Sequence, residues 1–298
     1  MSAIFKKGGK ENSGNYWPVS LTSQVCKVFE SMLRVSIVDY LKENKLIHDS
    51  QHGFIKNRSC LTNLLHFLET VTDYIDKGYI DVIYWDFQKA FDKVPHRRLM
   101  HKLTAHGIGG KVWNWIQDWL SGREQRVVLL GSTSTWPPEK SVVPQVFWPW
   151  SVIYIYIYIY IYIYRDDSDD VVLIKILQFA DDTKLYRAVT NQDDIEILRS
   201  DLVNLYHWSK DWLMLFNIDK CKTLHIGSGN LNELCNMAGR PLEAVYEEYD
   251  LGVLITKDLK CSKQCLNAAK AANKLLGMIK RIFTYKSEEI ILQLYNHW

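Results

Sequence analysis

The sequence lacks a strong excess of charge of either sign. Its 298 residues carry 36 Lys and Arg against 34 Asp and Glu, which gives a formal net charge of +2. A balance this close to zero is not typical of a nucleic-acid-binding domain, which usually carries a clear basic excess. Hydrophobic residues make up 47% and charged residues 23% of the chain, so its composition is that of a globular protein and excludes wholesale disorder.

The sequence also lacks the cysteine and histidine patterns of a zinc site or a disulfide framework. Its six cysteines are scattered, no two of them form a C-x-x-C pair, and no histidine pair stands at zinc spacing. This pattern favours a reducing compartment. Cys261 and Cys265 are four positions apart, on one face of a predicted helix, where we expect core packing.

No targeting signal or membrane span is evident. The first 15 residues are charged and contain no apolar stretch like that of a signal peptide, so we expect a nuclear or cytoplasmic protein. Residues 146–164 carry no charge, but Pro149, the many tyrosines and the alternating pattern argue against a transmembrane helix. Because no Pro/Ser-rich linker is present, we expect one multi-lobed unit. We expect no membrane partner, and the sequence identifies no protein partner.

The hydrophobic pattern predicts an α+β fold. Amphipathic periodicity predicts helices over residues 21–45, 61–77, 111–120, 192–212 and 262–283, and one that begins at Pro95 and ends near Gly107. Apolar and β-branched runs predict strands over residues 80–85, 171–179, 184–189, 223–226 and 251–255, and a hairpin at 125–133. Helices and strands are mixed along the chain without a regular alternation.

Two acidic positions stand out at the ends of apolar strands. Asp86 follows the run IDVIYW, and Asp181 and Asp182 lie in a short turn between two strands. Carboxylates at such positions are costly without a counter-charge, and a divalent cation such as Mg²⁺ would supply one. Two such ions can promote phosphoryl transfer. The alternatives are an ordinary Asp-Asp hairpin turn and an Asp that merely opens a loop.

An ordered set of motifs extends over nearly the whole chain. The motifs are NYWPVSLTS (15–23), QHGFIKNRSC (51–60), DFQKAFDKVPH (86–96), VPQ (143–145), FADDTKLY (179–186), FNIDKCKTLHIG (216–227) and DLGVLI (250–255). With them the sequence resembles the reverse transcriptase of non-LTR (LINE) retrotransposons of the jockey kind. The resemblance implies a right-hand polymerase fold, with fingers, a palm built on a small antiparallel sheet, and a helical thumb.

The resemblance also implies an activity. It is RNA-directed DNA polymerisation, with an RNA template, a DNA primer, deoxynucleoside triphosphates and two Mg²⁺ ions, or Mn²⁺ in their place. Asp86, Asp181 and Asp182 correspond to the catalytic metal ligands. Lys220 corresponds to the lysine of an N-x-x-K motif, a candidate general acid for pyrophosphate release. The alternative for Lys220 is a solvated surface charge.

Four further residues correspond to nucleotide- or template-binding positions: Arg58, Lys89, Phe91 and Gln145. Phe91 matches the aromatic residue that screens the sugar 2′ position, and its alternative is plain core packing. Arg58 matches the second arginine of a G-F-R-x-x-R-S motif, and its alternative is an exposed loop charge. Residues 1–255 correspond to fingers and palm. Residues 256–298, with eight Lys and Arg against three Asp and Glu, correspond to a basic thumb that would hold the duplex by its phosphates.

The chain departs from the family pattern in several places. Trp17 and Ile55 stand where the family has arginines, and Val146 stands where it has the glycine that lets the backbone approach the nucleotide. Residues 153–164 read IYIYIYIYIYIY, which a TA dinucleotide repeat encodes; a designed β-strand is the less favoured alternative. These departures favour a second hypothesis, a non-catalytic remnant with weak nucleic-acid binding, and we expect the chain to be a fragment of a longer retroelement protein.

Overall fold

The computed structural model describes residues 2–6, 8–19, 23–47, 49–53, 55–75, 78–88, 95–124, 126–129, 131–136, 174–179 and 182–282, with residues 288 and 292. The chain divides into two compact units, Met1–Val245 and Tyr246–Trp298. Helices and strands are mixed, so the predicted α+β class is confirmed. The disrupted segment 146–164 lies outside the described residues.

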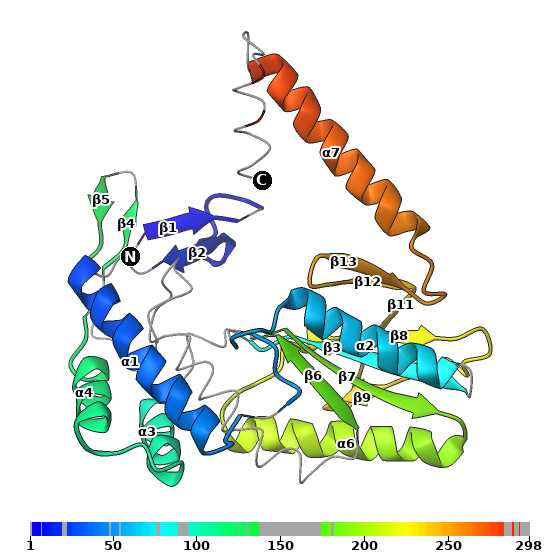
Figure 1. Ribbon diagram of the computed structural model, residues 1–298, viewed down its shortest axis with the longest axis horizontal. Helices are drawn as coiled ribbons and strands as arrows, with labels where there is room; N and C mark the ends of the chain where they lie inside the picture. The colour runs from blue at the N-terminus through cyan, green and yellow to red at the C-terminus, as the bar shows by residue number, and fades with distance from the viewer. Residues whose placement is uncertain are drawn as a thin grey trace. The chain divides into compact units, whose positions relative to one another are not determined.

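A five-stranded sheet lies in the first unit (Figure 1). Its strands, in spatial order, are β11 (Glu243–Val245), β8 (Lys222–Ile226), β3 (Tyr79–Trp85), β7 (Asp182–Val189) and β6 (Lys175–Phe179). Neighbouring strands are antiparallel, except that β11 is parallel to β8. The strand β3 is therefore central, and Ile80, Val82 and Ile83 are fully buried in it.

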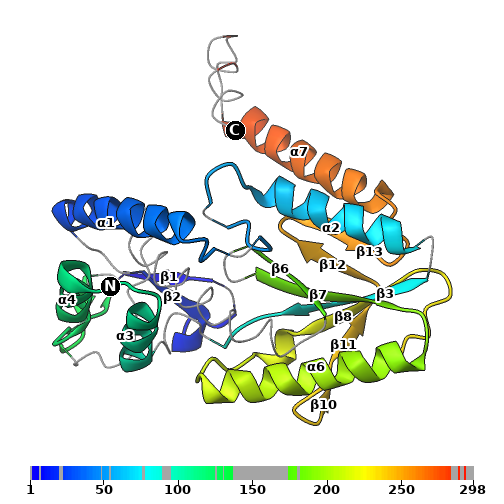
Figure 2. The same cartoon turned by 60° about the horizontal axis from the view of Figure 1, so that its bottom comes forward.

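Helices cover both faces of this sheet: α2 (Cys60–Ile75) and α6 (Gln192–Asp211) lie on opposite sides (Figure 2). Successive side chains of a strand point to opposite faces. Accordingly, Leu185 of β7 shares a core cluster with Leu202 of α6, whereas the ring of the next residue, Tyr186, lies 5.5 Å from that of Phe67 on α2. This burial on both faces explains why the central strand β3 is predominantly apolar.

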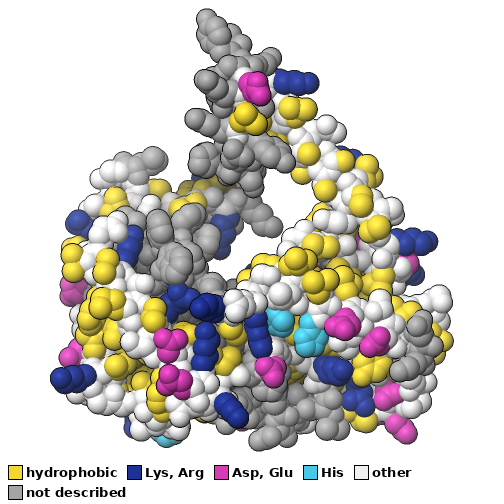
Figure 3. Space-filling model, in the orientation of Figure 1, with side chains coloured by type: hydrophobic (Ala, Val, Ile, Leu, Met, Phe, Trp, Pro, Cys, Tyr) yellow, Lys and Arg dark blue, Asp and Glu magenta, His cyan; other side chains and the backbone are white. Residues whose placement is uncertain are grey.

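Three more helices extend the same core: α1 (Gln24–Glu43), α3 (His96–Ala105) and α4 (Gly110–Leu120). The apolar stripe that predicts α1 is buried only in its second half, at Ile37 and Leu41. In the first half, Val25 and Met32 are 80% and 64% exposed, and apolar side chains lie on the surface along this helix (Figure 3). Amphipathic periodicity thus predicts the helix correctly without predicting what covers it.

Short elements complete the first unit. They are β1 (Ser2–Phe5), η1 (Ser13–Asn15), β2 (Tyr16–Val19), β4 (Val128–Leu129), β5 (Ser132–Thr133), η2 (Ile218–Lys220), β9 (Asn236–Met237) and β10 (Arg240–Pro241). The strands β2, β1, β4 and β5 form a second sheet in that order, and β4 with β5 is the predicted hairpin.

The second unit contains a hairpin, β12 (Glu247–Asp250) and β13 (Val253–Thr256), and the long helix α7 (Ser262–Ile282). The Leu254 N–H donates a hydrogen bond to the Gln264 side chain at 2.9 Å, which joins hairpin and helix. No described residue of α7 is buried, and Cys261 and Cys265 are exposed. The predicted core packing of these cysteines is therefore wrong. Two residues can share one face of a helix without any other element covering that face. Of the helices in the described ranges, none is long and apolar enough to cross a membrane.

Candidate active site

Asp86 is the first residue after the central strand β3, and its backbone is held by a distant segment. The N–H of Asn217 donates to the carbonyl oxygen of Asp86 at 2.7 Å, and the N–H of Gln88 donates to that of Leu215 at 2.7 Å. Between them, Phe87 and Phe216 form an isolated antiparallel bridge. Residues 86–88 are thus fixed against the chain that leaves α6, which limits where the Asp86 carboxylate can lie.

The same pairing brings Lys220 to Asp86. Residues 218–220 form the single turn η2 directly after the paired segment, and the Lys220 Nζ lies 2.5 Å from the Asp86 Oδ2. The two side chains are 66% and 35% exposed, so both can be reached from solvent. Lys220 is thus a largely exposed charge that is also paired with a predicted metal ligand.

Asp182 lies next to Asp86 by strand register. Trp85 pairs with Thr183 as the last pair between β3 and β7, so Asp86 and Asp182 each lie one residue beyond it on adjacent strands. Asp182 also closes the β6–β7 hairpin opposite Phe179. It is exposed and begins β7, whereas the sequence predicted it in the turn. Adjacent strands are about 5 Å apart, which places the two carboxylates in one neighbourhood.

Buried aromatic side chains flank Asp86 in the sequence and pack against one another. Trp85 and Phe216 stack with ring centroids 4.6 Å apart, and Phe87 lies 5.2 Å from Phe216. All three are less than 8% exposed. Their role was not predicted, although aromatic residues that flank a strand-end aspartate in sequence were a visible signal. These three aromatic residues form a buried apolar base that holds the backbone on both sides of Asp86. Such packing is expected where the position of a side chain matters for function.

Cys221 directly follows Lys220 in the sequence and is fully buried near Asp86. Burial raises the pKa of its thiol to about 11, and the negative charge of Asp86 acts in the same direction, while a hydrogen bond with the Asp86 backbone opposes it. The thiol is therefore protonated at neutral pH, and we assign Cys221 to packing rather than to chemistry.

The carboxylates fit a hard divalent cation. Carboxylate oxygens are the preferred ligands of Mg²⁺ and Mn²⁺, and both Asp86 and Asp182 are open to solvent. Within the described ranges, no group of three or more His, Cys, Asp or Glu side chains forms a metal site. The third predicted ligand, Asp181, lies outside those ranges, as do Lys89, Phe91 and Gln145.

Arg58 is engaged within its own loop. Its guanidinium donates to the carbonyl oxygens of Asp49 and Gln51 at 2.5 and 2.6 Å, and to the Asp49 carboxylate at 2.8 Å. This loop is attached to β6, since the N–H of His52 donates to the carbonyl oxygen of Gln178 at 3.0 Å. The alternative of a free, exposed Arg58 is therefore wrong, and these contacts indicate a role in holding the loop to the sheet.

The sequence comparisons agree on one family. Residues 4–279 match the family described as reverse transcriptase (RNA-dependent DNA polymerase). The probable RNA-directed DNA polymerase from transposon X-element of Drosophila melanogaster is 26% identical over 88% of this chain and 29% of its own length. The RNA-directed DNA polymerase from mobile element jockey of the same organism is 23% identical over 86% and 28%. The chain thus spans less than a third of these relatives.

Solved structures give the same fold. An apo telomerase from Candida tropicalis, truncated from its C-terminal domain, superposes with a TM-score of 0.51 and 11% identity over 77% of this chain and 44% of the telomerase. A telomerase from the same organism, in complex with a fragment of telomeric RNA, gives 0.53 and 10% over 79% and 38%. The fold is that of a right-hand polymerase, and the chain belongs to the reverse transcriptase (RNA-dependent DNA polymerase) family.

Proposed function

We propose that this chain is the RNA-directed DNA polymerase domain of a non-LTR retrotransposon, acting in the nucleus or cytoplasm. It would extend a DNA primer on an RNA template with deoxynucleoside triphosphates. The observation that carries the proposal is the placement of Asp86 at the end of the central strand, one strand away from Asp182 and in contact with Lys220. The chain brings together from distant segments the carboxylates and the cation that nucleotidyl transfer needs.

Reverse transcriptases generally use divalent metal ions, and we propose that Asp86, Asp181 and Asp182 hold two Mg²⁺ ions, or Mn²⁺ in their place. When bound, such ions would favour loss of the proton from the attacking 3′-hydroxyl and stabilise the negative charge of the leaving pyrophosphate. The protein's own contribution is to fix its carboxylates by strand register and by the apolar base of Trp85, Phe87 and Phe216. No rearrangement of the backbone is then needed to assemble this part of the site.

Lys220 would act at the leaving group. Its ammonium group lies against Asp86 and is 66% exposed, so it can turn toward a bound triphosphate without unfolding its turn. From there it can neutralise charge on the departing pyrophosphate and donate a proton to it. Arg58, Lys89, Phe91 and Gln145 keep their proposed roles near nucleotide and template, which rest on the family resemblance.

We assign residues 1–255 to fingers and palm and residues 256–298 to the thumb. The helix α7 supports this, because it carries five cationic residues and no Asp or Glu: Lys263, Lys270, Lys274, Lys280 and Arg281. None of the described residues of α7 is buried. Lys263 forms an ion pair with Glu247, and the other four cations are exposed where they could meet the phosphates of a duplex. An RNA–DNA hybrid is held mainly through its backbone and shape, so a neutral overall charge is compatible with binding.

Primer extension on an RNA template with Mg²⁺ tests the proposal. Incorporation by the wild-type protein that disappears in Asp86→Asn, Asp181→Ala and Asp182→Asn would support it. Asp73→Asn, which changes an exposed carboxylate on α2, is the matched control and is expected to retain full incorporation. Absence of incorporation by folded wild-type protein would support the non-catalytic remnant instead, and retained incorporation in Asp86→Asn would contradict the assigned role of this residue.

A further inference from the structure

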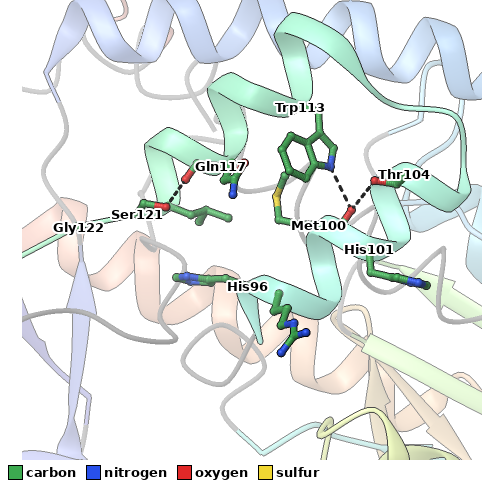
Figure 4. Close-up of a pocket in the computed structure, with 10 residues that line it drawn as sticks. His96, Met100, His101, Thr104, Trp113, Gln117, Ser121 and Gly122 are labelled. Atoms are coloured by element: carbon green, nitrogen blue, oxygen red, sulfur yellow. Dashed lines mark hydrogen bonds between the residues drawn. The ribbon is translucent and has the colours of Figure 1, made fainter.

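A pocket separate from the predicted metal ligands lies between α3 and α4. It has a volume of about 540 Å³ and opens to solvent. Side chains of both helices line it: His96, Arg97 and His101 from α3, and Trp113 and Gln117 from α4, with Ser121 just beyond it. Figure 4 shows Trp113, Gln117 and Ser121 on the side of α4 that faces α3. We call it the α3–α4 pocket.

Among the described residues, the lining of the α3–α4 pocket includes one cation and two imidazoles and no Asp or Glu. Arg97 and His101 are one helical turn apart, so they project from the same face of α3. Neither side chain has an ion-pair or hydrogen-bond partner among the described residues, and both are exposed. A cation without a protein carboxylate nearby favours an anionic ligand, and a guanidinium suits a phosphate in particular.

The other cations of α3 are used differently. Lys102 and Arg98 lie over the ring of Trp212, with the charged groups 4.2 and 5.9 Å from its centroid. Lys102 is only 6% exposed, so this pair belongs to the packing of α3 on the end of α6. The cations of α3 thus lie on two adjacent faces: Arg98 and Lys102 pack against Trp212, and Arg97 lines the pocket.

Trp113 gives the α3–α4 pocket a fixed aromatic surface. Its indole N–H donates to the carbonyl oxygen of Met100 at 3.2 Å, and the Thr104 hydroxyl donates to the same oxygen at 3.1 Å. The ring is therefore oriented by its polar end while its carbon surface lines the pocket. Aromatic rings of this kind stack with nucleobases, and the volume is sufficient for one nucleotide.

We propose that the α3–α4 pocket binds one nucleotide unit of single-stranded nucleic acid, with the phosphate at Arg97 and His101 and the base against Trp113. This proposal rests on the proposed function, because the RNA template would be the single-stranded nucleic acid that reaches the pocket. The ligand chemistry, a phosphate joined to a base, is shared with free nucleotides. The pocket would give the protein a template contact that is separate from its metal ligands.

Binding of a short fluorescein-labelled single-stranded RNA, followed by anisotropy in EDTA, tests this proposal without any need for catalysis. Arg97→Ala is expected to raise the Kd about three- to tenfold. The slope of log K against log salt should fall by about 0.7, the value for one lost single-strand phosphate contact. Arg97→Lys should recover part of the affinity. Lys111→Ala removes an exposed cation from the first turn of α4 outside the pocket and is the matched control.

The competing ligands identify the source of the nucleotide. If unlabelled RNA but not AMP competes for the Arg97-dependent part of binding, the pocket binds nucleic acid; if AMP competes as well, it binds free nucleotides by the same chemistry. Equal Kd values for wild type, Arg97→Ala and Lys111→Ala would overturn the proposal. Primer extension on the same preparations separates the two proposals, because loss of polymerase activity alone leaves the Arg97 effect on RNA binding intact.

Discussion

Lys220 contacts Asp86 across 134 positions of sequence, with the ammonium nitrogen 2.5 Å from a carboxylate oxygen. The contact follows from the short antiparallel pairing of residues 86–88 with 215–217, which fixes both side chains at one end of the central strand. Because both groups are partly exposed, the ion pair itself adds little to the free energy of unfolding. Its interest is chemical, because the proposed role of Lys220 at the leaving pyrophosphate requires a cation close to the predicted metal ligand Asp86.

Replacing Lys220 should affect turnover far more than stability. Lys220→Ala is expected to lower kcat in primer extension by about 10²- to 10⁴-fold, the range for loss of a positioned proton donor. The KM for the nucleotide should change less, and Lys220→Arg should restore part of kcat through its charge. Lys210→Ala, at the exposed end of α6, is the control and should leave kcat unchanged. A Lys220→Ala protein with wild-type kcat would remove Lys220 from the reaction.

Replacing Arg58 should destabilise the loop of residues 49–58. Arg58→Ala removes the donors for the carbonyl oxygens of Asp49 and Gln51, and Gln51 is 2% exposed, so its carbonyl group would lose its partner in a buried place. The expected loss in the free energy of unfolding is about 1–3 kcal/mol, measured by urea denaturation. Lys56→Ala, at an exposed position of the same loop, should cost under about 0.5 kcal/mol. Equal stability of both variants would contradict the structural role.

Acid should weaken the attachment of the same loop through His52. Burial lowers the pKa of this imidazole to about 4, and the positive charges of Arg58, His66 and Lys184 act in the same direction. In the unfolded chain the pKa is about 6.5, so the unfolded state binds the proton first. The free energy of unfolding should therefore fall as the pH drops from about 6.5 toward about 4.

The variant His52→Gln tests this pH dependence, because glutamine can keep a hydrogen bond to Thr62 but cannot be protonated. Urea denaturation at a series of pH values should show a smaller loss of stability in acid for His52→Gln than for wild type. His207→Gln, on the exposed side of α6, should follow the wild-type curve. Parallel curves for all three proteins would show that His52 does not control the acid response.

Four of the six cysteines should fall into two classes of reactivity. Burial raises the pKa of Cys235 to about 12, and the negative charge of Asp81 acts in the same direction; Cys221 is fully buried as well. Both should resist iodoacetamide at about pH 8 until the protein is unfolded, because only an accessible thiolate reacts. Cys261 and Cys265 are exposed and should react in the folded protein. Mass spectrometry of peptides distinguishes the four sites, and early labelling of Cys221 or Cys235 would contradict their burial.

The local pattern of the sequence predicted the main helices and longer strands closely and missed the short strands β1, β2, β9, β10, β11 and β12. The helices predicted over 61–77 and 111–120 are observed as α2 (Cys60–Ile75) and α4 (Gly110–Leu120), and the strand predicted over 80–85 is β3 (Tyr79–Trp85). Periodicity of apolar residues depends on nearest turns and alternating faces, which a linear sequence contains in full. Even the position of Asp86 at a strand end could be predicted, since a polar residue after an apolar run marks where burial stops.

The pairing of distant segments could not be predicted in the same way. The residues around Lys220 do not indicate that its turn lies against residue 86, and the QHGFIKNRSC motif does not indicate that Arg58 bonds to its own loop. The exposed half of α1 and the uncovered face of α7 have amphipathic patterns that resemble those of buried helices. An apolar stripe shows which side of a helix could be buried and carries no information about the partner that would cover it.

The sequence by itself determined the main helices and most of the longer strands, the α+β class and, through its ordered motifs, membership of the reverse transcriptase family. Tertiary structure alone decided the environment of the chemical groups: Lys220 on Asp86, Asp182 one strand away, Arg58 turned inward, and the division of the α3 cations between Trp212 and the α3–α4 pocket. The physical reason is that propensity and periodicity act over a few residues, whereas register, burial and charge pairing depend on how segments pack together in three dimensions.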